Sequence, residues 1–470
     1  MRFLQSEYYY FVFVSMTDIL LVPLLFLLAI VVAYLYASKR RQKDEYYRYL
    51  PWGVAFKLLS VIAFCFVYLI FYEGDTLDYY NSAVALNNVA SYNFSYYLDL
   101  MIHGNQPEYW SYFNSQTGFV ESHMFRDPNT FFVIRLISPL VMISGESFLI
   151  SSMIMALFSF VGIWKFYRLL NLLYPTLYKY SFFAALLIPS VLFWGSGILK
   201  DSITMSSTAW ITYSIFMVIF IRRKIIINLI IIIFLSYFII SIKPYIFISL
   251  VPGLLIWVFF NQVKKIRNKL LRFLTIPLTG VVVLVAASLL LSYMGQYLGV
   301  YGDVDSMITK VKVTQEDLLR STVYGSNSYN IGIIDPTPMG LLSKAPAAIV
   351  AGLFRPFLWE ARNPFVIISG LENLAILLLL VFIMIKVGIL NFFRAIIKDP
   401  FLTYALVFAL LFAFGVGLAS TNFGALVRYR IPMMPFLVSG LFILLQHYRE
   451  RRKRKENAEQ NDAQTPVPDS

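Results

Sequence analysis

The chain has 470 residues, of which 59% are hydrophobic and only 14% are charged, whereas soluble domains carry about 25% charged residues. This composition excludes an ordinary soluble enzyme, a disordered chain and a typical nucleic-acid-binding protein. The net charge of +13 is expected to reflect membrane topology before any acidic ligand. With one cysteine (Cys65) and three histidines, disulfide, zinc and redox chemistry are not expected.

The apolar runs along the chain predict an all-α, polytopic membrane protein. A helix of roughly 20 apolar residues spans the bilayer core. Eleven runs of that kind occur, at residues 18–36, 53–72, 148–166, 181–199, 203–221, 225–242, 245–261, 272–293, 366–386, 401–419 and 426–446. Two weaker runs, 131–145 and 346–358, are broken by arginine and proline, and we expect re-entrant or interfacial helices there.

Basic residues indicate which side of the membrane each connection occupies. Clusters lie at residues 39–43, 222–224, 264–269, 394–398 and 451–455. Such clusters mark the cytoplasmic side, and eleven spans place all of them there. The N-terminus is then external and the C-terminus cytoplasmic, in the inner membrane of a bacterium.

The same topology divides the chain into one membrane domain and a tail. Residues 1–448 are expected to form a single transmembrane domain with two long external loops, at 73–130 and 294–345. Residues 449–470 are first basic, then polar with prolines, and the polar part is expected to be disordered.

The first external loop begins with two carboxylates, Asp75 and Asp78, followed by Tyr79. A carboxylate at the membrane surface can face a cavity, where partial desolvation raises its pKa toward that of a useful base. It can also do no more than cap the next helix. We expect one of the two to be a catalytic base, with Tyr79 suited to stacking on a sugar ring.

Five cations sit where the positive-inside rule does not expect them, at the external ends of spans. They come from four regions of the chain and are Lys200, Lys243, Arg355, Arg428 and Arg430. Each one alone is most simply explained by a partner such as Asp201, Glu360 or a lipid headgroup. Together, at one predicted depth, they favour a shared phosphate or diphosphate, which arginine can bind in a bidentate way.

The segment that carries the last two arginines begins at Asn422, which we include among the substrate-binding candidates. Arg428 and Arg430 are two residues apart, so on a helix they would point about 200° apart. Pro432 favours a break there. We therefore expect 422–430 to be a loop or broken helix, with one arginine on the phosphate and the other paired with an acidic residue.

These elements resemble the GT-C superfamily of membrane glycosyltransferases: an acidic Gly74-Asp75 start to the first external loop, many spans, and the terminal Arg428-Tyr429-Arg430-Ile431-Pro432 element. The resemblance implies a sugar donor on a polyprenyl phosphate carrier and catalysis at the outer face. It also implies that Asp75 or Asp78 activates the acceptor and that Arg428 and Arg430 lie near the carrier phosphate. The extra leading span departs from the pattern of many members.

A weaker resemblance is to Wzy-type O-antigen polymerases and ligases, which the element Ser196–Lys200 would also fit. A transporter or flippase for a lipid-linked glycan is the alternative from a different class. The leading expectation is an inverting sugar transfer to a glycan, lipid or protein acceptor, with cations stabilising the leaving phosphate. No cofactor is expected; a divalent metal is possible but not required, since the cations can do its work, and nucleic acid is not an expected partner.

Overall fold

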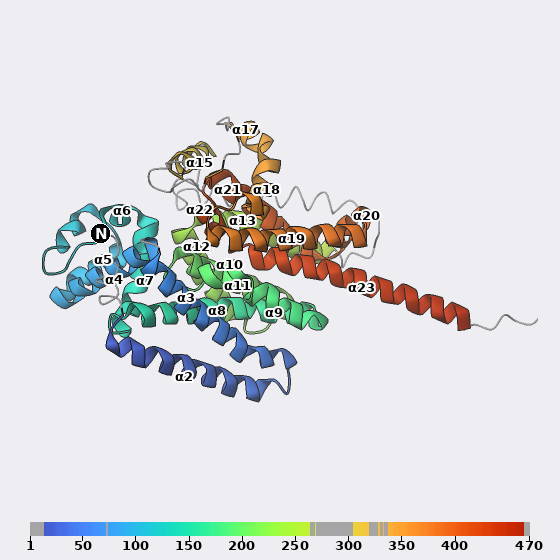
Figure 1. The fold of residues 1–470 in the computed structure, drawn as a ribbon, viewed down its shortest axis with the longest axis horizontal. Coiled ribbons are helices and arrows are strands. Elements are labelled where there is room, and N and C mark those ends of the chain that lie inside the picture. Colours follow the sequence, from blue (N-terminus) through green and yellow to red (C-terminus); the bar gives the residue numbers. More distant parts are fainter. Residues whose placement is uncertain are drawn as a thin grey trace, which may run out of the picture.

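The computed structural model describes residues 14–71, 74–263, 268, 304–318, 328–329, 332 and 337–464. These residues form helices and their connections, with an isolated bridge between Ser328 and Asn422 and no strand within the described ranges. Figure 1 shows the longer helices running roughly along the long axis of the molecule. The predicted all-α class is confirmed for this part of the chain.

Within the described part of the chain, seven helical segments are long and apolar enough to cross a membrane, or eight if one bent pair counts as a span. The helices in these segments are α2 (Met16–Arg40), α3 (Leu50–Ile70), α8 (Phe148–Leu173), α11 (Lys200–Phe216), α12 (Ile225–Ile242), α19 (Pro364–Val387) and α21 (Pro400–Ala419). The bent pair is α22 (Phe423–Tyr429) and α23 (Met434–Gln464), which meet at 67°. Each lies on a run that the sequence predicted to span.

Three of the eleven predicted spans have no counterpart among these. The run 181–199 is divided into α9 (Tyr178–Leu186) and α10 (Pro189–Trp194), because Pro189 keeps Ile188 extended and starts a new helix. The run 245–261 forms α13 (Pro244–Val263), whose apolar part falls short of a full span. The run 272–293 lies outside the described residues. The weaker runs form the short helices α7 (Pro128–Ile143) and α18 (Ala345–Phe354).

The first external segment is largely helical rather than a loop. It contains α4 (Asp75–Tyr92), α5 (Phe94–His103) and α6 (Ser122–Arg126). In α4, residues Ala83, Leu86 and Val89 recur every three positions and are fully buried, so this helix is stabilised by one packed face. The second segment has α15 (Val304–Leu318) and α17 (Pro338–Ser343), and most of its remainder lies outside the described residues.

The expected disorder of the C-terminal tail is not what the structure has up to residue 464. Helix α23 continues through Gln464. Glu, Ala and Gln are good helix formers, and extending an existing helix avoids the cost of nucleation. The last six residues, 465–470, lie outside the described part.

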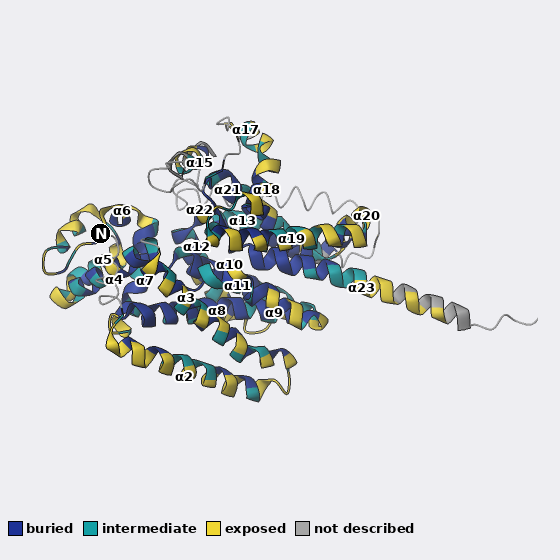
Figure 2. Ribbon diagram, in the orientation of Figure 1, coloured by how far each residue is buried: buried dark blue, intermediate teal, exposed yellow. Residues whose placement is uncertain are grey.

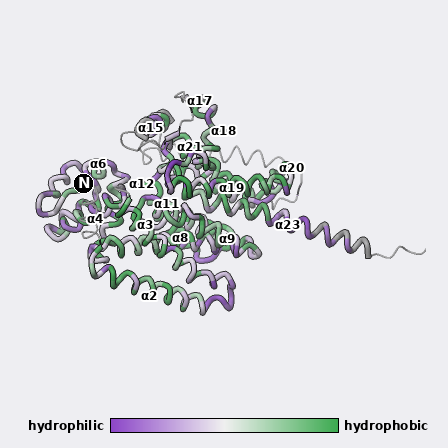
Figure 3. Tube along the Cα trace, viewed as in Figure 1, coloured by the Kyte–Doolittle hydropathy of each residue, from purple (hydrophilic) through white to green (hydrophobic). Residues whose placement is uncertain are grey.

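The outer surface of the helices is apolar, as a lipid-facing surface should be. Helix α2 is exposed along much of its length in Figure 2 and largely hydrophobic in Figure 3. Leu20 of α2 and Ile230 and Ile233 of α12 are among the exposed side chains. Contiguous apolar surface of this kind is rare on soluble monomers, so the fold is that of a multi-pass membrane protein.

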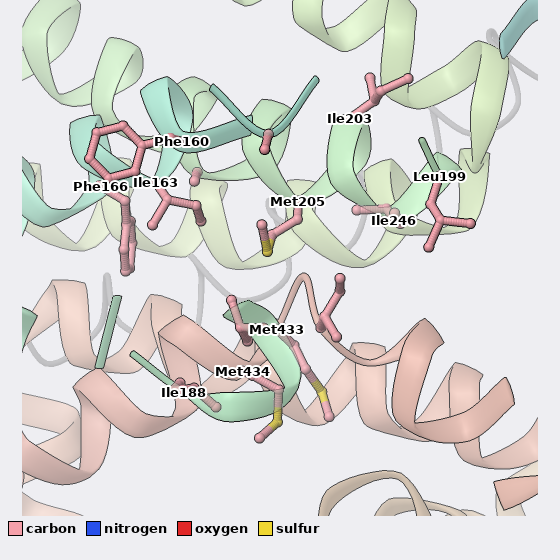
Figure 4. Close-up of a cluster of buried hydrophobic side chains, with 14 of the residues drawn as sticks. Phe160, Ile163, Phe166, Ile188, Leu199, Ile203, Met205, Ile246, Met433 and Met434 are labelled. Carbon is pink, nitrogen blue, oxygen red and sulfur yellow. The ribbon is translucent and has the colours of Figure 1, made fainter. Parts of the chain in front are cut away.

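Two features of the interior hold the C-terminal helices in place. A Cβ atom on Gly417 of α21 would lie 1.9 Å from the backbone oxygen of Ala348 in α18, so only glycine permits this approach. Figure 4 shows Met205 of α11 opposite Met433 and Met434, which follow α22. All three methionines are buried. Near them, the Nε atom of Arg428 in α22 lies 3.3 Å from Asp201, in the first turn of α11.

Candidate functional site

A cavity of about 1300 Å³ lies where α4, α7, α11, α12, α13, α21 and α22 meet. Five of the predicted site residues line it: Asp75, Tyr79, Lys200, Lys243 and Arg428. They come from four distant parts of the chain. Three of the five cations that the sequence placed at one membrane depth thus share a cavity with the start of α4.

Asp75 and Arg428 form the ion pair that joins α4 to α22. Asp75 is the first residue of α4, and Arg428 lies in the last turn of α22. An Nη2 hydrogen of Arg428 is donated to Oδ2 of Asp75 at 2.7 Å. The Asp75 side chain remains 45% exposed. This carboxylate is therefore held by the guanidinium and still open to the cavity.

Asp201 is the buried centre of the charged cluster. Its side chain is 1% exposed, in the first turn of α11. The Nε atom of Arg428 lies 3.3 Å from Oδ2 of Asp201, and Lys243 donates a hydrogen bond to Oδ1. The Lys243 ammonium also lies 4.6 Å from the ring centroid of Tyr429. One carboxylate thus fixes two of the five predicted cations.

Lys200 belongs to a second, linked pair. Its ammonium is 3.3 Å from Oδ2 of Asp127 and donates to Oγ1 of Thr130 at 2.6 Å. Asp127 caps α7, where it accepts hydrogen bonds from the backbone of Asn129 and Thr130. Lys200 therefore joins the start of α11 to the start of α7, on the wall of the cavity.

The two acidic candidates in α4 have pKa values shifted in opposite directions. The Arg428 guanidinium, against an opposing effect of burial, holds the pKa of Asp75 below its ordinary value. Burial, together with repulsion from Asp75 and Glu121, raises the pKa of Asp78. The expectation of a raised pKa is thus wrong for Asp75, which lines the cavity. It fits Asp78, which is not among the cavity-lining residues.

Tyr79 lies one helical turn after Asp75 and also lines the cavity. Burial, and then the nearby Asp75 carboxylate, raises the pKa of Tyr79 well above its ordinary value. Its phenol is therefore neutral at physiological pH, in a residue that is otherwise buried.

Arg430 points away from the cavity and holds the interior together. It is fully buried and donates to the carbonyl oxygens of Arg355 and Leu353 and to Oδ1 of Asn373. Its Nη2 lies 3.8 Å from Glu372. Arg428 and Arg430 do diverge at the break before α23, as their spacing predicted, but Arg430 is fixed in the protein interior rather than at the cavity.

Two other predicted site residues also have local partners. Arg355 pairs with Glu360 at 3.2 Å. Asn422 caps α22 by accepting hydrogen bonds from the backbone of Gly424 and Ala425. Neither is among the residues that line the cavity.

The sequence did not identify the carboxylates that hold these cations as parts of one site. Asp127 precedes Pro128, which is a signal for a helix start and carries no sign of a distant partner. Asp201 was considered only as a neutralising partner. In the structure, the cavity has three carboxylates, Asp75, Asp127 and Asp201, that pair with three cations.

No known family model matches the chain, and neither the curated proteins nor the solved structures include one that is significantly similar to it. Among the residues that the structure describes, no three His, Cys, Asp or Glu side chains gather closely enough to hold a metal ion. The function must therefore be argued from the geometry of the cavity.

Proposed function

We propose that this protein is a membrane glycosyltransferase of GT-C type, which moves a sugar from a polyprenyl-phosphate carrier to an acceptor at the external face of a bacterial inner membrane. The observation that carries the proposal is the pair formed by Arg428 and the half-exposed Asp75 inside a cavity that also holds Lys200 and Lys243. A base and phosphate-binding cations are what sugar transfer from a phosphate leaving group requires.

The other side of the cavity suits a lipid substrate. Its lining includes Ile233 and Tyr237 of α12, which are 70% and 55% exposed on the outside of the helix bundle. Phe132 of α7 and Ile240 of α12 extend this apolar wall inward. A carrier could place its phosphate at the charged end while its chain leaves past α12 into the bilayer.

The ion pairs suggest how such a donor would be activated. Asp201 and Lys243 are buried and paired to each other, so the Asp201 carboxylate is held in a fixed position beside Arg428. Asp75 is the exposed partner and is the one that an incoming phosphate can replace on Arg428. Losing its cation would let the pKa of Asp75 rise again, which makes its carboxylate a better acceptor for a hydroxyl proton.

The reaction would then be a single displacement at the anomeric carbon. Asp75 accepts the proton of the acceptor hydroxyl, whose oxygen forms the new glycosidic bond. The bond from the anomeric carbon to the phosphate oxygen breaks, and Arg428 stabilises the charge that develops on the leaving phosphate. In this reaction Tyr79, one turn from Asp75 on the cavity wall, would contact the sugar ring.

Lipids that co-purify with the protein test this proposal. The full chain would be extracted from its native membrane, and bound lipids would be identified by mass spectrometry for wild type and Arg428→Gln. We expect polyprenyl phosphates with wild type and a loss of at least tenfold with the variant. The same preparation would then be given the identified donor and assayed for sugar transfer.

Three outcomes would overturn the assignment. Absence of any polyprenyl lipid from the wild-type protein would remove the proposed substrate class. Carrier binding without transfer, together with movement of the lipid-linked sugar across proteoliposomes, would identify a transporter. A product lengthened by whole repeat units would instead indicate a Wzy-type polymerase.

A further inference from the structure

A second cavity, of about 520 Å³, lies at the other end of the helix bundle. The first cavity is lined by the start of α11 and the end of α21. The second is lined by Phe216 at the end of α11, by Phe220 just beyond it, and by Phe401 at the start of α21. A helix of this length separates its ends by roughly 25 Å. The two cavities therefore lie near opposite faces of the membrane.

The second cavity has an apolar interior and a basic rim. Phe216, Phe220 and Trp257 form its inner wall. Lys398, at the end of α20 (Ile389–Lys398), and Arg451 of α23 lie at its rim, and both are exposed. Basic side chains next to an aromatic cavity are complementary to a ligand in which a phosphate is attached to an apolar chain.

Asp399 is the acidic residue in the lining, and its carboxylate is already engaged. The hydroxyl of Tyr174 lies 2.8 Å from both of its oxygens, and Nε2 of His447 lies 2.9 Å from Oδ2. The backbone of Leu402 donates to Oδ1 at 3.1 Å. These hydrogen bonds fix the Asp399 side chain in the wall of the cavity. The lining contains this one carboxylate and the two rim cations, Lys398 and Arg451.

Helix α20 places the rim at the membrane surface. Its apolar side chains Leu390 and Ile397 are 72% and 57% exposed, while Arg394 and Lys398 lie among them in the sequence. A short helix with an exposed apolar face and basic residues is typical of helices that lie in the interface and attract anionic lipids. Figure 2 shows exposed residues on this helix.

We propose that the second cavity binds an anionic phospholipid of the surrounding bilayer, with its phosphate held by Lys398 and Arg451 and the start of its acyl chains against Phe216, Phe220 and Trp257. The site is separate from the cavity of the proposed transferase and does not depend on that activity. Its occupant is a membrane lipid rather than a substrate, because the cavity opens beside the interfacial helix α20.

Native mass spectrometry of the full chain tests this proposal. Wild type, Lys398→Gln, Arg451→Gln and the double variant would be titrated with phosphatidylglycerol and, separately, with phosphatidylcholine of the same chains. We expect wild type to prefer phosphatidylglycerol, and each substitution to weaken that binding about fivefold. The double variant should bind the two lipids equally.

Arg449→Gln is the matched control, since it removes the same charge from α23 at a residue that does not line the cavity and instead contacts Tyr180. It should bind phosphatidylglycerol like wild type. Equal binding by wild type and the double variant, or an equal loss in the control, would overturn the proposal. Glycerol 3-phosphate binding as tightly as the lipid would also overturn it, because the ligand would then be a soluble phosphate.

Discussion

The carboxylate of Asp75 accepts a 2.7 Å hydrogen bond from the guanidinium of Arg428, 353 positions away in the sequence. The pair links the first helix of the external segment to the last turn before α23. The chemistry proposed for the cavity depends on this pair. Arg428 is also paired with the buried carboxylate of Asp201, while Asp75 remains half exposed. Of these two carboxylates, only that of Asp75 can readily separate from the Arg428 guanidinium.

Asp75 and Asp78 differ in what their removal should do. Asp75→Asn should lower transfer by a factor of about 10²–10⁴, as expected for loss of a general base. Asp78→Asn is the matched control, since Asp78 is one turn away and not among the cavity-lining residues, and it should keep activity near wild type. Transfer rates with purified donor provide the measurement, and an equal loss in both variants would argue against Asp75 as the base.

Substitutions of Arg428 and Arg430 should have different effects. Arg428→Lys keeps the charge but loses the bidentate fork, so donor affinity should fall while thermal stability stays near wild type. Arg430→Lys should mainly destabilise the protein, because Arg430 is fully buried and holds two backbone carbonyls and Asn373. Thermal unfolding in detergent, read beside donor binding, separates the two effects. Equal melting temperatures for the two variants would contradict this assignment.

The Asp201–Lys243 pair offers a test of buried charge. Asp201→Asn leaves the Lys243 ammonium without its carboxylate, and breaking a buried pair in this way typically costs about 3–5 kcal/mol. The double variant Asp201→Asn/Lys243→Met should recover most of that stability but not donor binding, because Arg428 has lost its anchor. Recovery of both would mean that the pair is structural only.

Acid should release the Asp75–Arg428 pair only at low pH. The pKa of Asp75 is held below its ordinary value of 3.8 by Arg428. A carboxylate with a lowered folded pKa stabilises the fold above its unfolded pKa, and that contribution is lost as pH falls through the folded value. The stability difference between wild type and Asp75→Asn should therefore be constant near neutral pH, should begin to shrink as pH falls below about 4, and should be lost as pH falls through the lowered pKa of Asp75. A difference that already disappears near pH 6 would contradict the lowered pKa.

Part of this site could be predicted from the sequence, because the apolar spans set the depth of each residue in the membrane. Lys200, Lys243 and Arg428 each lie at the same predicted end of a span, so their meeting in one cavity could be expected from topology. Which way each side chain turns depends on helix rotation and on partners far away in the chain. That is why Arg430, at the same depth, faces Asn373 and Glu372 instead.

The fold was predictable to a similar extent. Apolar length identified helices such as α8 and α19, but it could not distinguish a straight span from the pair α9 and α10, which Pro189 separates. Hydropathy also marked the first external segment as a loop. Its helix α4 depends on one buried face that pairs with α7, and this pairing is a tertiary contact that local composition does not contain.

Binding of the carrier phosphate to three proteins tests the central claim most directly. Wild type, Asp75→Asn and Arg428→Gln would be titrated with a polyprenyl phosphate, with thermal unfolding used to confirm that each is folded. If the phosphate replaces Asp75 on Arg428, Asp75→Asn should bind at least as tightly as wild type, because the competing carboxylate is gone, and Arg428→Gln should bind at least tenfold more weakly. Equal weakening in both variants, or no change in Arg428→Gln, would contradict the account.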